Sequence, residues 1–328
     1  MRAPMLITAF LVYVFAMPVP IQAGQARAVP EVGLLFPVAG ADKNEVMDSF
    51  KAWLMDGLQA LGYVEGKNIH VEVRAPRKPE DLAEMAADLV NRKVDVIATS
   101  GPTSIEAAKR ATATIPIVII ACDRADRLVN SIARPGGNIT GMACISSDLA
   151  LKRLQLMQQM LPGLSHLAVL FNGGVPAKVA ELQDVTAAAK TLEVEVHSAD
   201  VRDASEFTTA FAAIKAGNPD GLLILVDPLT FFYLKEIANF AAEQRLPSMY
   251  GFREFCDAGG LLSYGANLKH QVRRYGYFID KILKGTKPGD IPIEDPTIFE
   301  LIVNARTAKL LGLPIPNSIL IGADQVIE

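Results

Sequence analysis

The stretch VDVIATSGPTSIEAAKRATATIPIVIIA, residues 94–121, decides the fold class of this 328-residue chain. Val94–Thr99 has the length and apolar composition of a buried strand, and Thr103–Ala111 predicts a helix after a small, hydroxyl-rich turn. A second apolar run, Ile117–Ala121, begins after a proline and predicts another strand. Strand, helix and strand with short connections indicate a parallel α/β sheet.

The same alternation continues on both sides of this unit. Before it, Glu31–Phe36 and Ile69–Val73 read as strands, each followed by apolar residues at helical spacing. After Pro135–Asn138 the pattern restarts, and the predicted strands are Ile139–Ile145, Leu167–Phe171, Val194–Val196, Leu222–Val226 and Pro247–Tyr250. A helix beginning near Ser147 and Asp148 is predicted after the first of them. We therefore expect two similar lobes, each a doubly wound parallel sheet.

The last third of the sequence adds elements to lobes that are already complete. Its predicted elements are a strand at Gly260–Tyr264, a helix at Gln271–Leu283, a strand at Thr297–Val303 and a helix at Thr307–Leu311. We read this as the chain recrossing between the lobes, so lobe I comprises residues 29–143 plus 267–293 and lobe II residues 144–266 plus 294–328. A hinge of several segments permits clamshell closure.

Residues 1–28 have the pattern of a cleaved export signal. Arg2 precedes the apolar run Met5–Met17, and Ala26–Ala28 offers an A-x-A cleavage pattern. The run is shorter than the roughly 20 apolar residues that a membrane-spanning helix needs. The alternatives are an uncleaved anchor or a buried first helix. We expect a periplasmic mature protein, monomeric and without a membrane anchor.

Composition and motifs exclude several classes of function. With 32 basic and 36 acidic residues well mixed along the chain, no basic stripe predicts a nucleic-acid partner. Three cysteines are too few and scattered for a disulfide framework. The sequence has no GxGxxG turn, phosphate loop, HExxH or GxSxG motif, and its four histidines are dispersed. We expect no cofactor, no metal and no enzymatic activity.

Candidate ligand-binding residues follow the predicted strands, because ligands of open parallel sheets bind at the carboxyl ends of the strands. They are Pro37, Ser100, Gly101, Thr103, Ser104, Cys122, Asp123, Asn172, Asp227, Tyr250, Phe252 and Tyr264. The turn Ser100–Ser104 opens a helix and could seat an anion, or it is an ordinary helix cap. Asp123 and Asp227 could accept a ligand ammonium or hydroxyl group, or they cap loops.

Aromatic and sulfur-containing side chains near these strand ends are interpreted in the same way. Tyr250 and Phe252 are expected to form apolar walls for the ligand. Most of the run Phe231–Tyr233 is expected to be core. Cys122 has no histidine placed to activate it, so a small buried thiol is favoured over a nucleophile.

Several phrases of the sequence together resemble one family of ABC-transporter substrate-binding proteins, which includes the TrpX-like receptors for tryptophan and tyrosine. They are GYVEGKNI at 62–69, ARPGGNITG at 133–141, LPSMYGFREF at 246–255, AGGLLSYG at 258–265 and DKILKG at 280–285. The resemblance covers the mature chain and implies a type I periplasmic-binding-protein fold, a small-molecule ligand, and an ABC permease with its ATPase subunit as partners. In relatives a proline usually follows the aspartate after the first lobe's strand, whereas here Arg124 follows Asp123, so we do not transfer an aromatic amino-acid specificity to this chain from the resemblance.

Three functions remain open from the sequence. The first is a receptor that captures a small solute, with an amino acid or small carboxylate favoured, and delivers it to the permease. The second is the same receptor loading a sensor or signalling ectodomain. The third is a secreted enzyme on this fold, with Cys122 or Asp123 catalytic.

Overall fold

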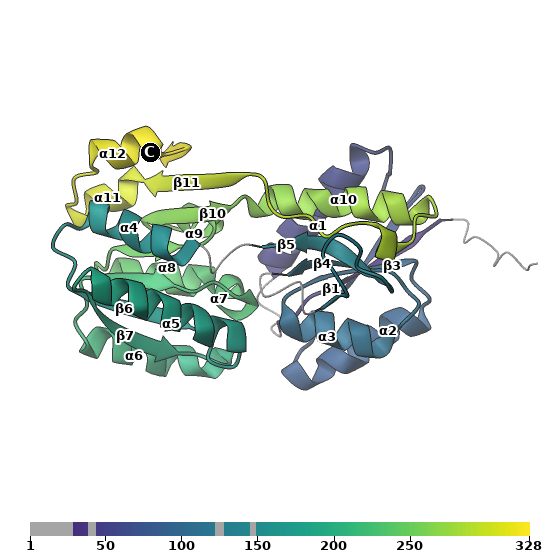
Figure 1. Ribbon diagram of the computed structural model, residues 1–328, viewed down its shortest axis with the longest axis horizontal. Coiled ribbons are helices and arrows are strands. Elements are labelled where there is room, and N and C mark those ends of the chain that lie inside the picture. Colours follow the sequence, from purple (N-terminus) through teal and green to yellow (C-terminus); the bar gives the residue numbers. More distant parts are fainter. Residues whose placement is uncertain (1–28, 39–43, 122–127, 145–148) are drawn as a thin grey trace, which may run out of the picture.

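Two α/β lobes lie side by side in the computed structural model, which describes residues 29–38, 44–121, 128–144 and 149–328 (Figure 1). The first lobe contains the sheet built from the N-terminal strands and includes the later helix α10, Leu268–Leu283, drawn in yellow-green. The second lobe, coloured teal to yellow, contains the sheet built from the remaining strands. The predicted pair of doubly wound lobes is confirmed.

Lobe I has a five-stranded parallel sheet in the order β2-β1-β3-β4-β5. The strands are β1 Glu31–Leu35, β2 His70–Arg74, β3 Val96–Ser100, β4 Ile117–Ala121 and β5 Ile139–Ala143. Helices α1 Asn44–Gln59 and α10 Leu268–Leu283 cover one face, and α2 Leu82–Asn91 and α3 Pro102–Ala111 cover the other. A 3-10 turn at Pro79–Asp81 precedes α2, and another lies at Pro288–Asp290.

Strand β3 shows why this sheet reads as continuous apolar runs. Val96 and Ala98 belong to the core cluster under α1 and α10, whereas Ile97 belongs to the cluster under α2 and α3. Successive side chains of a strand point to opposite faces, so a sheet with helices on both faces needs apolar residues at every position.

Lobe II has a seven-stranded sheet in the order β12-β11-β10-β9-β8-β6-β7. The strands are β6 His166–Phe171, β7 Glu195–Asp200, β8 Gly221–Ile224, β9 Ser248–Tyr250, β10 Leu262–Ala266, β11 Phe299–Asn304 and β12 Gln325–Ile327. The pairing of β10 with β11 is antiparallel, and the other pairs are parallel. The strands in the last third of the chain, β10, β11 and β12, therefore extend this sheet and do not build a new one.

Helices cover both faces of the lobe II sheet. Helices α4 Ala150–Met160, α5 Pro176–Thr191, α11 Ala305–Leu311 and α12 Asn317–Gly322 contribute to one core cluster, and α6 Phe207–Ala216 and α8 Leu234–Glu243 contribute to the other. The short helices α7 Pro228–Phe232 and α9 Arg253–Asp257 follow β8 and β9, and a 3-10 turn at Ala204–Glu206 precedes α6. The expected cap at Ser147 and Asp148 lies outside the described residues.

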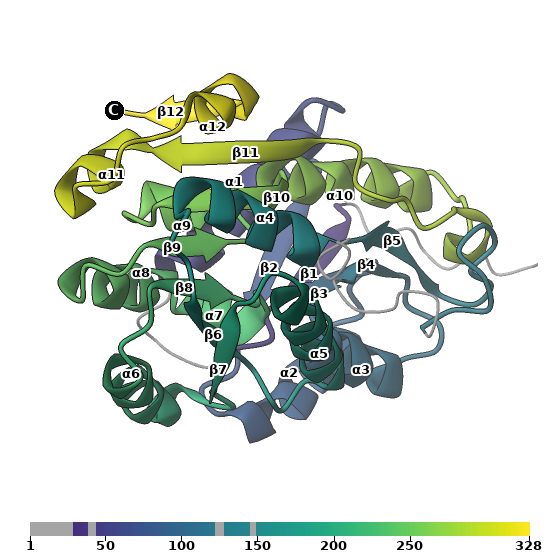
Figure 2. The same ribbon diagram turned by 60° about the vertical axis from the view of Figure 1, so that its left-hand side comes forward.

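The chain passes between the lobes after β5, between β10 and α10, and between Pro288–Asp290 and β11. Figures 1 and 2 both show α10 and the segment leading into β11 on the same side of the molecule. These crossings form the recrossing that the sequence predicted. Within the part of the chain that the structure describes, no helix has the length and apolar character needed to cross a membrane.

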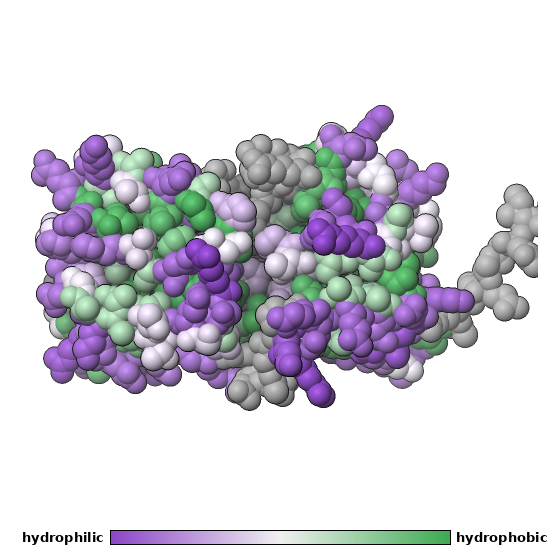
Figure 3. Space-filling model, turned by 90° about the horizontal axis from the view of Figure 1, so that it is seen from below, coloured by the Kyte–Doolittle hydropathy of each residue, from purple (hydrophilic) through white to green (hydrophobic). Residues whose placement is uncertain are grey.

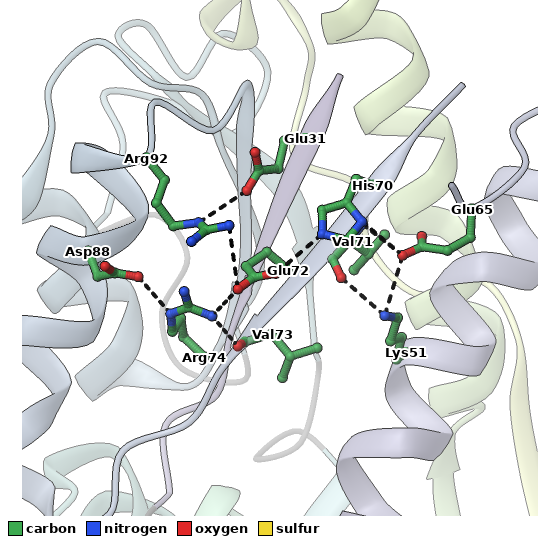
Figure 4. A network of polar contacts seen from close by, with 10 residues as sticks. All are labelled: Glu31, Lys51, Glu65, His70, Val71, Glu72, Val73, Arg74, Asp88 and Arg92. Atoms are coloured by element: carbon green, nitrogen blue, oxygen red, sulfur yellow. Dashed lines mark hydrogen bonds and ion pairs between the residues drawn. The ribbon is translucent and has the colours of Figure 1, made fainter. Parts of the chain in front are cut away.

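The exposed edge of lobe I carries a network of charged side chains along β2 (Figure 4). We call it the edge network; its members are Glu31, Lys51, Glu65, His70, Glu72, Arg74, Asp88 and Arg92. Arg74 pairs with Glu72 and, at 2.7 Å, with Asp88, while Arg92 lies 3.2 Å from Glu31. Charges on an edge strand oppose pairing with another chain, so this network is a structural feature of the sheet edge.

Candidate ligand-binding site

The strand order of each sheet places its ligand-binding edge. In lobe I the chain turns to opposite sides after β1, so the switch point lies between β1 and β3, where Pro37 and Ser100 end the strands. In lobe II the switch point lies between β6 and β8, where Asn172 and Asp227 follow. Asn172 Nδ2 donates a 2.6 Å hydrogen bond to Asp227 Oδ2 across this point. Switch points are where open α/β sheets bind ligands.

A cavity of about 570 Å³, including space open to solvent, is lined by both lobes. Lobe I contributes Phe50, Ser100, Gly101, Pro102, Ile120 and Leu268, and lobe II contributes Lys178, Val226, Asp227, Pro228, Phe231, Phe232 and Phe252. The lining is mainly apolar with few charged groups, as in small-molecule sites. The structure thus brings together four of the predicted residues in one cavity: Ser100, Gly101, Asp227 and Phe252.

A wider groove of about 1340 Å³, a volume that also includes space open to solvent, shares Pro102, Asp227 and Pro228 with this cavity. Three more predicted residues lie in its lining, namely Pro37, Thr103 and Asn172. The groove also has charged residues from both lobes: Arg77, Lys78, Glu80, Arg202 and Asp203. Figure 3 views the molecule from below and shows hydrophilic side chains on both lobes beside their junction. We describe the groove as the mouth of the cavity.

Aromatic rings join the two lobes at the cavity. Phe36 and Phe50 of lobe I contact Phe232 and Phe231 of lobe II edge-on, with ring centroids 5.9 and 6.0 Å apart. Phe231 also contacts Phe252 at 5.8 Å. Phe231 and Phe232 are buried, as expected of core residues, but they also line the cavity. Aromatic surface of this kind favours a ligand with an apolar body.

Gly101 is the point where the lobe I turn meets lobe II. Its φ is +84°, and a Cβ added there would overlap the ring of Pro228. Both the left-handed backbone and the close approach require glycine. The interlobe contact at this position therefore depends on the missing side chain.

The Ser100–Ser104 turn, which the sequence suggested as an anion-binding site, uses its Ser104 hydroxyl for hydrogen bonds within the turn. Ser104 is fully buried, and its Oγ donates to the carbonyls of Ser100 at 2.6 Å and Gly101 at 3.3 Å. Helix α3 has no side-chain cap and no acidic residue in its first turn. The hydroxyl of Ser104 is thus used inside the turn, and what faces the cleft is the helix end itself.

Asp227 has the capping role that the sequence left as an alternative. It begins α7 with a capping box, in which its Oδ1 accepts from Thr230 N at 2.9 Å and from Thr230 Oγ1 at 3.0 Å. With Asn172 on Oδ2, three of the roughly four lone-pair positions of the carboxylate are occupied. The buried carboxylate still lines the cavity and keeps room for one more donor.

The two predicted tyrosines do not line the cavity. Tyr250 is fully buried and stacks on Phe255 with centroids 4.5 Å apart, and burial raises the pKa of its phenol well above the usual range. The carbonyl of Tyr264 accepts a 2.8 Å hydrogen bond from Arg153 Nε. A strand end places the chain at the cleft but does not fix the direction of each side chain. The candidates Cys122 and Asp123 lie outside the described residues.

Cys144, directly after β5, is disulfide-bonded, whereas the sequence spacing gave no sign of a disulfide. Cys256 is a free, buried thiol. Among the described residues, no group of three His, Cys, Asp or Glu side chains is arranged to hold a metal ion.

A charged cluster behind the cavity wall was not predicted from the sequence. We call it the cavity cluster, and its members are Arg153, Lys178 and Glu181. Lys178 Nζ donates to Glu181 Oε2 at 2.7 Å, and Arg153 lies 3.6 Å from Glu181 Oε1. The side chains of all three are only 1–2% exposed. Burial lowers the pKa of the Arg153 guanidinium, and Glu181 opposes that shift.

The sequence gives only a weak signal for this cluster, a lysine in the segment between the predicted strands Leu167–Phe171 and Val194–Val196. Lys178 is the third residue of α5, at the positive end of the helix dipole, where a cation is unfavourable. Such a placement is a weak signal, because most lysines near helix ends are solvated. Burial against the cavity is what distinguishes Lys178.

Two α/β lobes connected by several crossing segments and enclosing a cavity define a type I periplasmic binding protein. The chain belongs to the ABC transporter substrate binding protein family, whose model matches residues 37–327. It is 26% identical over 271 residues to a tyrosine-binding protein of Clostridioides difficile (strain R20291), covering 81% of this chain and 77% of that one.

Solved structures share the fold. A conserved domain protein from Vibrio cholerae O1 biovar El Tor str. N16961 aligns with a TM-score of 0.81 at 23% identity, covering 91% of this chain and 99% of the other. An ABC domain in complex with L-Trp from Streptococcus pneumoniae aligns with a TM-score of 0.80 at 20% identity, covering 91% and 100%. The family resemblance inferred from the sequence phrases is confirmed.

Proposed function

We propose that this protein is the extracytoplasmic receptor of an ABC importer, which captures an amino acid or small carboxylate between its lobes and delivers it to the permease and ATPase. In this proposal residues 1–28 are a cleaved signal and the mature protein is a periplasmic monomer without catalytic activity. The tyrosine-binding relative and the L-Trp complex support an amino-acid ligand.

The observation that carries the proposal is the cavity lined by both lobes. Its apolar part, with Phe50, Phe231 and Phe252, suits a hydrophobic ligand body. The carboxylate of Asp227 suits a ligand ammonium, for which it has one acceptor position left. A ligand that contacts both lobes binds the closed form better and so shifts the population toward it.

Calorimetry with the purified mature chain tests this function. We expect saturable binding of one ligand per chain from a panel of L-amino acids, small carboxylates and sugars, and recovery of the ligand unchanged. Small-angle scattering should show a smaller radius of gyration with the ligand than without it. A bound solute that is converted during incubation would contradict the receptor proposal.

Asp227 gives the matched variant. Asp227→Asn keeps an oxygen for the cap of α7 but removes the negative charge, so we expect weaker binding of an amino acid and little change for the same acid without its ammonium group. Asp203→Asn, which changes a carboxylate that caps a turn at the groove, is the control. Equal loss for both ligands would contradict a role of Asp227 in binding the ammonium.

A further inference from the structure

The ammonium of Lys178 has fewer partners than its burial requires. Its side chain is 2% exposed, and among the described residues it donates a single hydrogen bond, to Glu181. An ammonium carries three N–H donors and no acceptor. Two donors of this group therefore have no protein acceptor among the described residues, although the side chain is almost fully buried, and unpaired buried polar groups are costly.

Lys178 belongs to the lining of the cavity in which a ligand would lie. Apart from Ser100 and Asp227, the side chains that line the cavity with Lys178 are apolar and accept no hydrogen bonds, and neither of these two is hydrogen-bonded to Lys178 among the described residues. Its place in the first turn of the 16-residue helix α5 adds the positive end of the helix dipole to its own charge. The combination favours a negatively charged partner.

Lys178 and Asp227 line one cavity without forming an ion pair with each other, as far as the described residues show. Opposite charges that face the same cavity and remain separate match a ligand that carries both charges. Asp227 retains one acceptor position and Lys178 two donors, so the two ends of such a ligand are accommodated on lobe II.

We propose that Lys178 binds the carboxylate of the ligand, so that lobe II holds the charged end of a small amino acid or carboxylate while the aromatic residues of both lobes contact its body. Glu181, paired with Lys178 and close to Arg153, holds the ammonium in place. This inference rests on the proposed function. It moves the anion site from the Ser100–Ser104 turn of lobe I, where the sequence placed it, to helix α5.

The test compares an acid with its amide. The probe is whichever of L-phenylalanine, L-tyrosine and L-tryptophan binds the wild-type protein most tightly, together with its carboxamide, which has the same shape and no negative charge. We expect the wild-type protein to prefer the acid by at least about tenfold, since hydrogen bonds between charged groups are the strong ones. This comparison needs no variant, so it holds even if substitutions at Lys178 prevent folding.

Lys178→Met then locates the preference. We expect its affinity for the acid to fall about 10- to 100-fold while its affinity for the amide changes less than about threefold. Lys190→Met, an exposed lysine of the same helix, should behave as wild type. A parallel loss of both ligands in Lys178→Met, or a preserved preference for the acid, would overturn the carboxylate site and leave the receptor function intact.

Two further outcomes separate the remaining alternatives. If inorganic phosphate competes with the acid at millimolar concentration but does not affect the amide, the site binds anions in general and the assignment of a carboxylate fails. If the wild-type protein binds none of the three amino acids or their amides and instead binds a sugar, the amino-acid proposal and the Lys178 inference fail together.

Discussion

Lys51 and Lys178 are both paired with a glutamate, but they differ in whether all their N–H donors have a partner. This difference separates a lysine with a structural role from one that we propose binds a ligand. In the edge network, Lys51 Nζ lies 3.1 Å from the carbonyl of Val71 and 3.5 Å from Glu65, and its side chain is 35% exposed (Figure 4). Protein and water together therefore satisfy its three donors. In the cavity cluster, Lys178 has one protein partner and 2% exposure. Unused donors without access to water are what indicate a ligand.

The glutamates show the same contrast. Glu72 of the edge network is shared by Arg74, Arg92 and His70 at a half-exposed surface, where solvent screens each pair. Glu181 is shared by Lys178 and Arg153, and the side chains of all three are only 1–2% exposed. Loss of the Glu72 carboxylate is therefore expected to change stability little, whereas the Glu181 carboxylate contacts two buried cations.

Glu181→Gln gives the largest effect expected from this contrast. Removing one partner of a buried ion pair costs about 3–5 kcal/mol, because the remaining charge stays uncompensated. We expect a loss of that order in the free energy of unfolding, measured by urea denaturation without ligand. Asp184→Asn, on an exposed position of the same helix, should change it by less than about 0.5 kcal/mol. A loss under about 1 kcal/mol for Glu181→Gln would show that the ion pairs of the cavity cluster contribute no more to the free energy of unfolding than exposed pairs such as those of the edge network.

Glu254 and Glu72 are expected to differ in their effect on the pH dependence of the free energy of unfolding. Burial raises the pKa of Glu254 from 4.5 to about 7, with Glu300 and Asp257 acting in the same direction and Arg253 opposing. Its Oε2 is buried without a hydrogen-bond partner. The hydrogen bond from Arg74, by contrast, lowers the pKa of Glu72. Of these two carboxyl groups, Glu254 is the one whose pKa is near neutral pH.

A raised pKa in the folded state means that the folded protein binds the proton more tightly. The contribution of Glu254 is therefore fully present below its unfolded pKa near 4.5 and is lost as pH rises through about 7. We expect the free energy of unfolding to fall by up to about 3 kcal/mol between pH 5 and 8. Glu254→Gln should flatten this slope, whereas Glu243→Gln, exposed on α8, should keep it. An unchanged slope in Glu254→Gln would refute the assignment.

Both lobes could be predicted from the sequence because their cores impose a periodic pattern. Val96, Ile97 and Ala98 are apolar at successive positions since both faces of β3 are buried, and that pattern survives without any knowledge of tertiary contacts. The same reasoning located the ends of the strands, and so it found Ser100, Gly101 and Asp227 at the cavity.

What the sequence could not supply is the direction and burial of individual side chains. Tyr250 ends its strand as predicted but points into the core against Phe255. Lys178 lies within a helix, and no periodic pattern of the sequence distinguishes a buried lysine from an exposed one. Its role depends on where α5 packs, which is decided by residues distant in the chain. Polar site residues on helices are for this reason harder to predict than those at strand ends.

Gly101→Ala tests whether the cavity cluster acts only when lobe I closes over it. The added Cβ would overlap Pro228, so the closed arrangement is disfavoured and we expect affinity to fall about tenfold, equivalent to about 1.4 kcal/mol. Gly62→Ala is the matched control, because Gly62 also has a positive φ, +90°, but no atom lies within 4 Å of its added Cβ. Calorimetry should show normal affinity for Gly62→Ala. Equal losses in both variants would attribute the effect to backbone strain instead of interlobe contact.

Lys51→Met gives the smallest expected effect and completes the comparison with Lys178→Met. A half-exposed ion pair contributes about 0.2–1 kcal/mol, and water replaces the lysine as a donor to the carbonyl of Val71. We expect a loss of stability within that range, reduced further in 1 M salt because screening weakens surface pairs. Ligand affinity should not change, since Lys51 does not line the cavity. If Lys51→Met weakened binding as much as Lys178→Met, the number of unused donors would not separate the two lysines. We expect Lys51→Met to bind the ligand normally and Lys178→Met to bind it much more weakly. That result would show that unpaired N–H donors identify the site, and that a lysine–glutamate pair alone does not.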